Sequence, residues 1–179
     1  MDLDIFLGKV RASTLFNYFY HFTDKKNLDS VRERGLLCTK ELRRLGIFKE
    51  VTPGGDAASQ ASDSKNGIDQ YVCLCFTNTH PMCHVATHRG VDPIDPTWLS
   101  INPDIIKAKG VMITDAPSNQ NGVVPQDPSA ALDDLHLDAI YKFIDWGEHP
   151  EAHAQRIIAE KYEILVPKQV VVDYIVQGL

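Results

Sequence analysis

One span in the middle of the chain concentrates side chains that could bind a metal. It holds three of the four cysteines and three of the seven histidines: Cys73, Cys75, Cys83, His80, His84 and His88. Structural zinc sites usually take thiolates from Cys-x2-Cys turns, whereas Cys73 and Cys75 are two residues apart in a segment typical of a buried strand. The pair His84 and His88 has helical spacing but lacks the glutamate that follows the first histidine in zinc proteases. We therefore predict reduced, buried thiols and no bound metal.

The chain carries no clear motif for nucleophilic catalysis. Cys83 and His84 are adjacent, and neighbouring residues seldom face each other in the geometry that a nucleophile and its base require. The sequence contains no Gly-x-Ser-x-Gly elbow and no glycine-rich phosphate loop. Acyl transfer and nucleotide hydrolysis of the P-loop type are therefore not indicated.

Two other side chains have surroundings that suggest chemistry. His21 lies in Tyr20-His21-Phe22-Thr23 at the end of an aromatic segment, and Glu163 directly precedes the apolar run Ile164-Leu165-Val166. Each also has a purely structural explanation. A histidine at a strand end is often satisfied by hydrogen bonds within the fold, and a glutamate beside apolar residues can reflect the wet and dry faces of a strand. Their meaning depends on the elements that carry them.

The sequence predicts a succession of short strands and helices. We expect strands at 14–23, 71–76, 98–101, 111–114, 160–166 and 170–176, and helices at 26–34, 40–49, 83–87, 103–108, 130–143 and 150–159. Residues 52–67, rich in Gly, Ala, Ser and Asp, predict a flexible loop of the kind that covers binding sites. Strands and helices do not alternate regularly, which favours an α+β fold.

Composition and charge restrict the class of protein. With 179 residues, 44% of them hydrophobic and 23% charged, the chain is typical of a single globular domain spanning 1–179. The first 50 residues hold 10 Lys or Arg against 7 Asp or Glu, and the rest hold 8 against 17. A basic strip at 32–49 is either a nucleic-acid contact or a solvated helix face. No apolar run is long enough for a membrane helix and no secretory signal is visible, so we predict a cytoplasmic protein without membrane contact.

Taken in order, the motifs resemble the DarT-type ADP-ribosyltransferases, toxin enzymes that attach ADP-ribose from NAD to nucleic-acid bases. The matching segments are Tyr20-His21-Phe22-Thr23, Asn27-Leu28, Gly35 with its following leucines, Tyr71-Val72 through Phe76, Pro81-Met82, Trp98–Asp115 and Glu163-Ile164-Leu165-Val166. The resemblance covers residues 18–176, which is nearly the whole chain. It implies an ADP-ribosyltransferase-like split β-sheet, flanked by helices, that binds NAD.

The resemblance also implies functional residues. It makes Glu163 and an arginine the catalytic groups, with Arg44 as the choice and Arg43 as the alternative. The residues implied for NAD binding are His21, Phe22, Thr23, Asn27, Ser30 and Tyr71. Breaking the bond between nicotinamide and ribose builds positive charge at ribose C1′, which a carboxylate stabilises. Glu160, three residues before Glu163, would point the opposite way on a strand.

The partners follow from the same resemblance. It implies single-stranded DNA or RNA as the acceptor, an antitoxin protein as a partner, and a place in a toxin–antitoxin or phage-defence system. Alternatives on the same fold are a protein ADP-ribosyltransferase and an NAD glycohydrolase. An alternative of another class is a non-catalytic binding module, against which the presence of both His21 and Glu163 argues.

Overall fold

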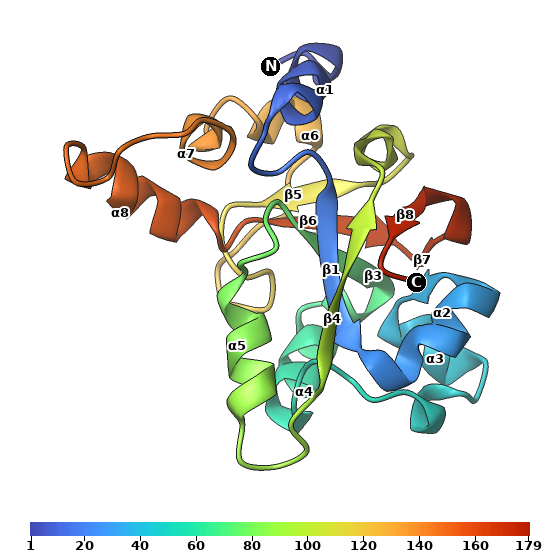
Figure 1. Ribbon diagram of the computed structural model, residues 1–179. Coiled ribbons are helices and arrows are strands. Elements are labelled where there is room, and N and C mark those ends of the chain that lie inside the picture. The colour runs from blue at the N-terminus through green and yellow to red at the C-terminus, as the bar shows by residue number, and fades with distance from the viewer.

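The protein is built on a six-stranded antiparallel sheet (Figure 1). A computed structural model describes residues 1–179. In spatial order the strands are β5 (Met112–Thr114), β6 (Glu163–Pro167), β3 (Tyr71–Cys75), β1 (Phe19–Asp24), β4 (Pro96–Ile101) and β8 (Ile175–Gln177). A separate two-stranded sheet pairs β2 (Leu36–Leu37) with β7 (Gln169–Val170). The predicted α+β class is confirmed.

The large sheet is split at its centre. β1 pairs with β4 along its whole length, from Phe19 opposite Ile101 to Asp24 opposite Pro96, and β3 pairs with β6 over all of its residues. Between β1 and β3, by contrast, the only paired residues are Tyr20 and Cys75. The sheet therefore consists of two three-stranded halves that diverge beyond this point.

Eight α-helices surround the sheet. They are α1 (Leu3–Ala12), α2 (Leu28–Arg34), α3 (Thr39–Arg44), α4 (Ala57–Lys65), α5 (Pro81–His88), α6 (Pro128–Ala131), α7 (Leu137–Tyr141) and α8 (Pro150–Ala159). Short 3-10 helices lie at 25–27, 48–50, 68–70, 103–107 and 172–174. Figure 1 shows α2, α3 and α4 near the end of β1 that leads into α2, and α1 and α6 near its other end. No helix has the length and apolar character needed to cross a bilayer.

Aromatic side chains fill the core at the far end of β1. The ring of Phe6 on α1 lies 6.3 Å from that of Phe19 and 6.4 Å from that of Phe76. Both Phe6 and Phe19 are completely buried. A buried phenylalanine contributes roughly 1.5–3 kcal/mol, so α1, which the sequence analysis did not anticipate, is an integral part of the core. Its first turn is capped by Asp2, whose carboxylate accepts hydrogen bonds from two backbone N–H groups.

Several predicted elements differ from those observed. The first strand begins at Phe19 rather than residue 14, and the helix expected at 130–143 is two short helices, α6 and α7. The segment 52–67, predicted to be a loop, contains α4. The Asp56 carboxylate caps this helix by accepting a hydrogen bond from the Ser59 N–H, and alanine and glutamine then extend it. Glu160 was expected on a strand but lies at the C-terminal end of α8, and β6 begins only at Glu163.

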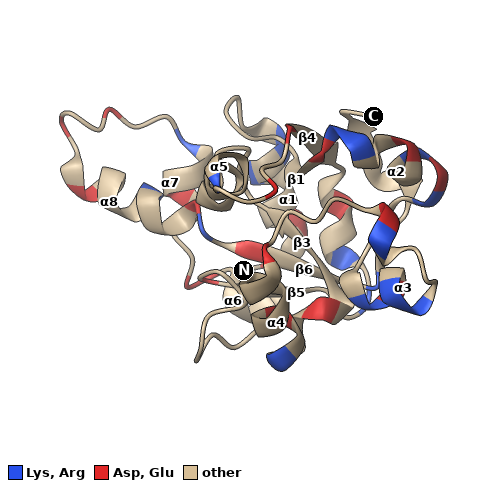
Figure 2. Ribbon diagram, turned by 90° about the horizontal axis from the view of Figure 1, so that it is seen from below, with Lys and Arg blue, Asp and Glu red and all other residues tan.

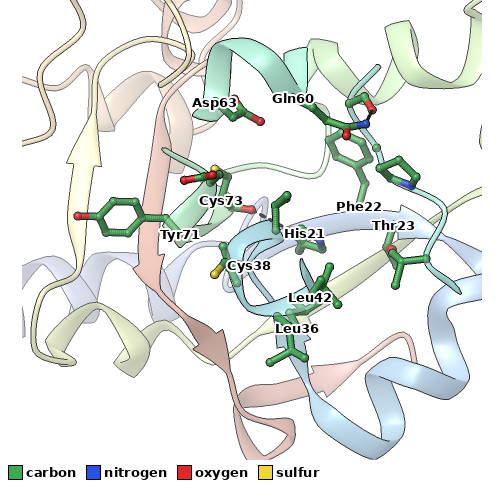
Figure 3. A pocket seen from close by; sticks show the side chains of 18 of the residues that line it. His21, Phe22, Thr23, Leu36, Cys38, Leu42, Gln60, Asp63, Tyr71 and Cys73 are labelled. Atoms are coloured by element: carbon green, nitrogen blue, oxygen red, sulfur yellow. Dashed lines mark hydrogen bonds between the residues drawn. The ribbon is translucent and has the colours of Figure 1, made fainter. Parts of the chain in front are cut away.

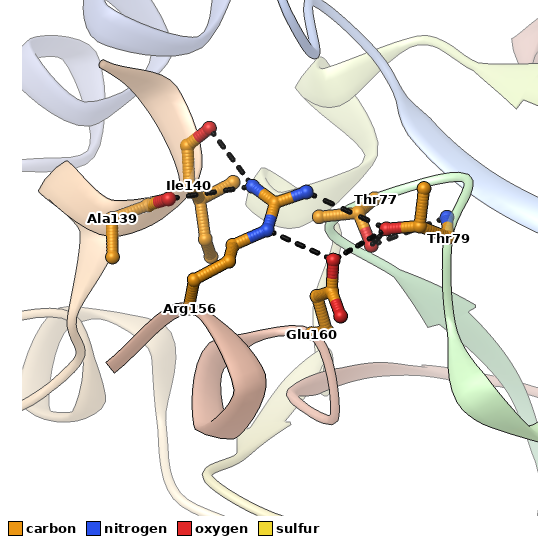
Figure 4. A network of polar contacts seen from close by, with 6 residues as sticks. All are labelled: Thr77, Thr79, Ala139, Ile140, Arg156 and Glu160. Atoms are coloured by element: carbon orange, nitrogen blue, oxygen red, sulfur yellow. Dashed lines mark hydrogen bonds and ion pairs between the residues drawn. The ribbon is translucent and has the colours of Figure 1, made fainter. Parts of the chain in front are cut away.

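Glu160 instead belongs to a partly buried polar network that fixes α8 to the segment after β3 (Figure 4). Arg156, only 5% exposed, donates to Glu160 over 2.9 Å and to the carbonyls of Ala139 and Ile140 over 3.3 Å. The Thr79 hydroxyl donates to the same Glu160 oxygen over 2.8 Å. Because a buried guanidinium must have its donors satisfied, this network holds the chain between β3 and α5 in one place.

Gly35 gives a test of how tightly β2 and β7 are packed. It has a φ of +72°, and a Cβ there would lie 2.2 Å from the Val170 carbonyl oxygen. Gly35→Ala should lower the free energy of unfolding by on the order of 3 kcal/mol, from backbone strain plus overpacking. Gly46→Ala, at a φ of +75° with open space around it, should cost only about 1 kcal/mol. Urea denaturation measures both, and equal losses would contradict the close approach.

Candidate active site

A cavity of about 260 Å³ lies where β1 and β3 diverge (Figure 3). Its walls come from the end of β1, from α2 and α3, from residues 51–55, from α4, from the start of β3 and from the start of β6. The split in the sheet thus brings together segments that are up to 142 residues apart in the chain, from His21 to Glu163. Every wall contributes at least one polar group or an aromatic ring.

His21 joins the two halves of the sheet inside this cavity. Its Nδ1 lies 2.8 Å from the Cys73 carbonyl oxygen. A carbonyl only accepts, so Nδ1 carries the hydrogen. Burial lowers the pKa of His21, which favours the neutral ring. Its Nε2 then has a free lone pair and can accept a hydrogen bond from a ligand.

Asn27 ties the end of β1 to the cavity's outer wall. Its side-chain amide donates to the Thr23 hydroxyl over 2.9 Å and to the Thr52 carbonyl over 2.8 Å, while its oxygen accepts from the Thr52 N–H over 2.9 Å. Further along, the Arg89 guanidinium donates to the carbonyls of Gly54 and Pro53. The first residues of the segment predicted to be flexible are therefore anchored at two points.

Glu163 is the buried acid of the site. As the first residue of β6 it pairs with Cys75 on one side and Thr114 on the other, and it is only 9% exposed. Its Oε2 accepts a 2.9 Å hydrogen bond from the Ser118 backbone N–H. Burial raises the pKa of Glu163, and the bond from Ser118 opposes that rise without cancelling it. The carboxylate is thus held in position but is electrostatically costly to ionise.

Most of the predicted site residues line this one cavity. They are His21, Phe22, Thr23, Asn27, Ser30, Tyr71 and Glu163. Tyr71 does so with its phenol pointing away from His21 (Figure 3). The alternation of wet and dry faces does not account for Glu163, because all of the first four residues of β6 are buried.

The predicted catalytic arginine does not reach the cavity. Arg44 is exposed on α3, where its Nε donates to Glu41 over 2.7 Å, and Arg43 donates to Ser64 and stacks over the ring of Phe48. No lysine or arginine lines the cavity at all. The charged groups that do line it are all acidic: Asp63, Asp69 and Glu163. α4, which comes before β3 in the chain, contributes Gln60 and Asp63 to the cavity wall and no arginine.

The family follows from comparison with known proteins. Residues 20–177 match the family model described as DarT, ssDNA thymidine ADP-ribosyltransferase. This chain belongs to the DarT family. The match confirms the predicted resemblance and the predicted enzyme class, an NAD-dependent ADP-ribosyltransferase with NAD as co-substrate. A search of curated proteins gave no match.

Solved structures of DarT proteins share the fold. A Thermus sp. 2.9 DarT in complex with ADP-ribosylated ssDNA superposes with a TM-score of 0.60 at 18% identity, covering 88% of this chain and 78% of that one. The same protein in complex with NAD+ gives a TM-score of 0.56 at 16% identity, with the same coverage. A Thermosipho africanus DarTG in complex with ADP-ribose gives 0.62 at 17% identity, and there the chain spans only 42% of the relative.

The sequence analysis missed several residues of the cavity. Ser118 and Asn119 come from the turn after β5, and Gln60 and Asp63 come from α4. His80, considered only as a possible zinc ligand, also lines the cavity. Its sole local signal was the following Pro81, since a capping residue before proline is typical of a helix start.

The cysteines and histidines of the central span do not form a metal site. No group of three or more metal-binding side chains is close enough to hold an ion. Burial raises the pKa values of both Cys73 and Cys75 well above the usual range for a thiol, so neither is a reactive thiolate at neutral pH.

The raised pKa of Glu163 predicts how stability depends on pH. Well below pH 4.5, the ordinary pKa of a glutamate, the carboxyl is protonated in both the folded and the unfolded chain, so it costs nothing. As the pH rises, the unfolded chain loses this proton first, and the penalty grows until the pH exceeds the folded-state pKa. Glu163→Gln, which mimics the protonated acid, should therefore be more stable than the wild type at pH 7.

Thermal melts of both proteins at pH 4 and pH 7 measure this effect. The stability difference between them should grow with pH, and Glu50→Gln, at an exposed glutamate that forms no ion pair, should show no such growth. A variant less stable than the wild type at pH 7 would mean that the carboxylate is stabilising.

Proposed function

We propose that this protein carries out its family's reaction in the cavity at the split of the sheet, with Glu163 as the catalytic carboxylate and single-stranded DNA as the acceptor. The observation that carries the proposal is electrostatic. A buried carboxylate, fixed by Ser118, faces a cavity that contains two further acids and no cation. Such a site favours a reaction in which positive charge develops.

The chemistry of ADP-ribosyl transfer has this requirement. When the bond between nicotinamide and ribose C1′ breaks, the electron pair leaves with nicotinamide and C1′ becomes cationic. A nucleophilic atom of the acceptor base then forms the new bond to C1′ and gives up its proton. Glu163 serves both steps, since its negative charge stabilises the cation and its raised pKa suits it to accept a proton.

The remaining walls of the cavity suit NAD, the donor of ADP-ribose. The free Nε2 of His21 accepts from a ribose hydroxyl, and Thr23, held by Asn27, offers a hydroxyl beside it. Phe22 presents an aromatic ring next to Gly54, with Ser30 and Tyr71 completing the proposed set. The positively charged nicotinamide ring is favoured by the acids, whereas the pyrophosphate must be bound by neutral donors because no basic side chain lines the site.

For the acceptor strand we propose a path over α3, outside the cavity. Lysine and arginine gather on this helix (Figure 2), which includes Lys40, Arg43 and Arg44. The inner side of α3 contributes Thr39 and Leu42 to the cavity, so its basic residues lie beside the site rather than in it. Phosphates contacted there would direct an unpaired base toward Glu163, since a base in a duplex is hidden in the stack.

The biological setting is part of the same proposal. We propose a toxin that acts in the cytoplasm, is restrained by an antitoxin protein and serves a toxin–antitoxin or phage-defence system. Support comes from the DarT family, from the Thermus relative in complex with ADP-ribosylated ssDNA, and from the larger size of the Thermosipho DarTG chain, of which this chain spans 42%.

The first test removes only the charge of Glu163. Glu163→Gln should reduce transfer of label from NAD to single-stranded DNA by at least about 10²- to 10³-fold, because the developing cation loses its stabilising charge. Labelled NAD is incubated separately with single-stranded DNA, RNA, duplex DNA and protein.

Glu160→Gln is the matched control, since Glu160 supports Arg156 and Thr79 but does not line the cavity. It should lower the melting temperature but keep transfer within a few-fold of the wild type, because glutamine retains a side-chain oxygen that can accept from Arg156 and Thr79. An active Glu163→Gln with an inactive Glu160→Gln would contradict the assignment of the carboxylate. Label found only in RNA or protein would replace the proposed acceptor.

The second test separates the strand path from the cavity. Arg43→Gln with Arg44→Gln should weaken transfer to DNA about tenfold or more at moderate salt, while hydrolysis of NAD without acceptor changes little. Lys107→Gln with Lys109→Gln removes the same charge from an exposed site elsewhere and should leave both activities intact. If NAD hydrolysis falls as far as transfer, the arginines act in the catalytic step, as the sequence resemblance implied for Arg44.

A further inference from the structure

One ring nitrogen of His80 caps a helix, whereas the other has no hydrogen-bond partner. It is the N-cap of α5, where its Nδ1 accepts a 3.2 Å hydrogen bond from the Met82 backbone N–H. An accepting Nδ1 carries no hydrogen, so in the neutral ring the hydrogen is on Nε2. Burial lowers the pKa of His80 to about 4, which keeps the ring neutral at physiological pH.

The Nε2 of His80 has no hydrogen-bond partner, although the side chain is almost completely buried. A buried donor without an acceptor is costly and rare. The Oε1 atom of Glu163 lies 3.7 Å from it, just beyond hydrogen-bonding distance. This Oε1 receives no hydrogen bond from the protein, whereas Oε2 is bound by Ser118. An unused donor therefore faces an unused acceptor inside the cavity.

The chain that carries His80 is held firmly. The preceding Thr79 is bound to Glu160, and Glu160 to the buried Arg156 (Figure 4). On its other side, His80 is fixed by its bond to Met82 at the start of α5. The ring is therefore constrained, and a movement of well under 1 Å by the carboxylate would complete the contact with Nε2.

We propose that His80 is a positioning residue, whose Nε2–H binds Glu163 Oε1 when substrate fills the cavity and so fixes the carboxylate from the side opposite Ser118. The proposal rests on the catalytic role proposed for Glu163. Catalytic hydrogen bonds are often long in an empty site and shorten when substrate is bound. Two donors, one on each oxygen, would then hold the carboxylate ionised and oriented toward ribose C1′.

Other charged and titratable groups face this pair and enter any pH dependence. Around His80 they are Glu160, whose charge raises the pKa of His80, and Lys161, whose backbone carbonyl raises it while its ammonium charge lowers it. Around Glu163 they are Asp63 on α4, which raises its pKa, and the buried thiols Cys73 and Cys75 on β3. None of these groups donates a hydrogen bond to Oε1, so losing the His80 donor should raise the pKa of Glu163 further.

Two substitutions separate the cap from the proposed contact. His80→Asn keeps a side-chain acceptor where Nδ1 caps α5 but is too short to present a donor at the position of Nε2. His80→Gln reaches that position with an amide N–H but is a poor cap. If His80 acts only as a helix cap, His80→Gln should lose more activity than His80→Asn. If His80 positions Glu163, His80→Asn should lose more.

We expect His80→Asn to lower kcat for transfer to single-stranded DNA by about 10- to 100-fold, the value of one hydrogen bond to a charged group. KM for NAD should be nearly unchanged, and the acidic limb of the kcat–pH profile should move to higher pH. His80→Gln should keep kcat within a few-fold and keep the limb in place, at the cost of a lower melting temperature.

The proposal fails if His80→Asn keeps the wild-type kcat and pH profile, or if kcat in the two variants simply follows their melting temperatures. Glu163→Gln, assayed alongside, distinguishes the two levels of failure. An inactive Glu163→Gln with a fully active His80→Asn overturns only the positioning role. An active Glu163→Gln overturns the proposed function and the positioning role together.

Discussion

The hydrogen bond from the His21 side chain to the Cys73 carbonyl is the contact on which the site depends. Two neighbouring strands that diverge leave unpaired N–H and C=O groups along both edges, and such groups are costly when buried. Through Nδ1, His21 donates a hydrogen bond to the Cys73 carbonyl on the edge of β3, and the two strands remain apart. The ladder can therefore stop after Tyr20 and Cys75, and a cavity opens where a continuous sheet would have been solid.

A second constraint is that this cavity must hold a carboxylate away from water. Glu163 begins β6 between two neighbouring strands, so its backbone is fixed by pairing on both sides, and only Ser118 offsets the cost of burial. The usual remedy for a buried acid is a cation beside it, but no lysine or arginine lines this cavity. The fold instead bears this cost and supports the site from outside, through Asn27, Arg89 and the Arg156–Glu160 network.

The family resemblance predicted which strand residues line the cavity. His21 and Thr23 lie within β1 and Glu163 begins β6, strands whose apolar patterns are visible without tertiary information, and Asn27 follows β1. Arg44 lies outside the cavity because packing decides which side of α3 faces inward, and its neighbour Glu41 binds it on the outside. The sequence could not show this orientation. α4 looked like a loop because alanine, serine and aspartate carry no apolar stripe. Ser118 and His80 act through a backbone N–H and an N-cap, which leave almost no trace in composition.

The distribution of charge follows from the two substrates that the proposed reaction brings together. A polynucleotide is attracted by cations at the surface, where salt screens them beyond about 8–10 Å. The reacting ribose becomes cationic and is favoured by acids in a buried site, where screening is weak. No arginine lines the cavity to bind the pyrophosphate, so the charged side chains around the reacting ribose are acids alone. Keeping the cations on α3 and the acids within lets one small domain attract an anionic strand and still stabilise a cation a short distance away.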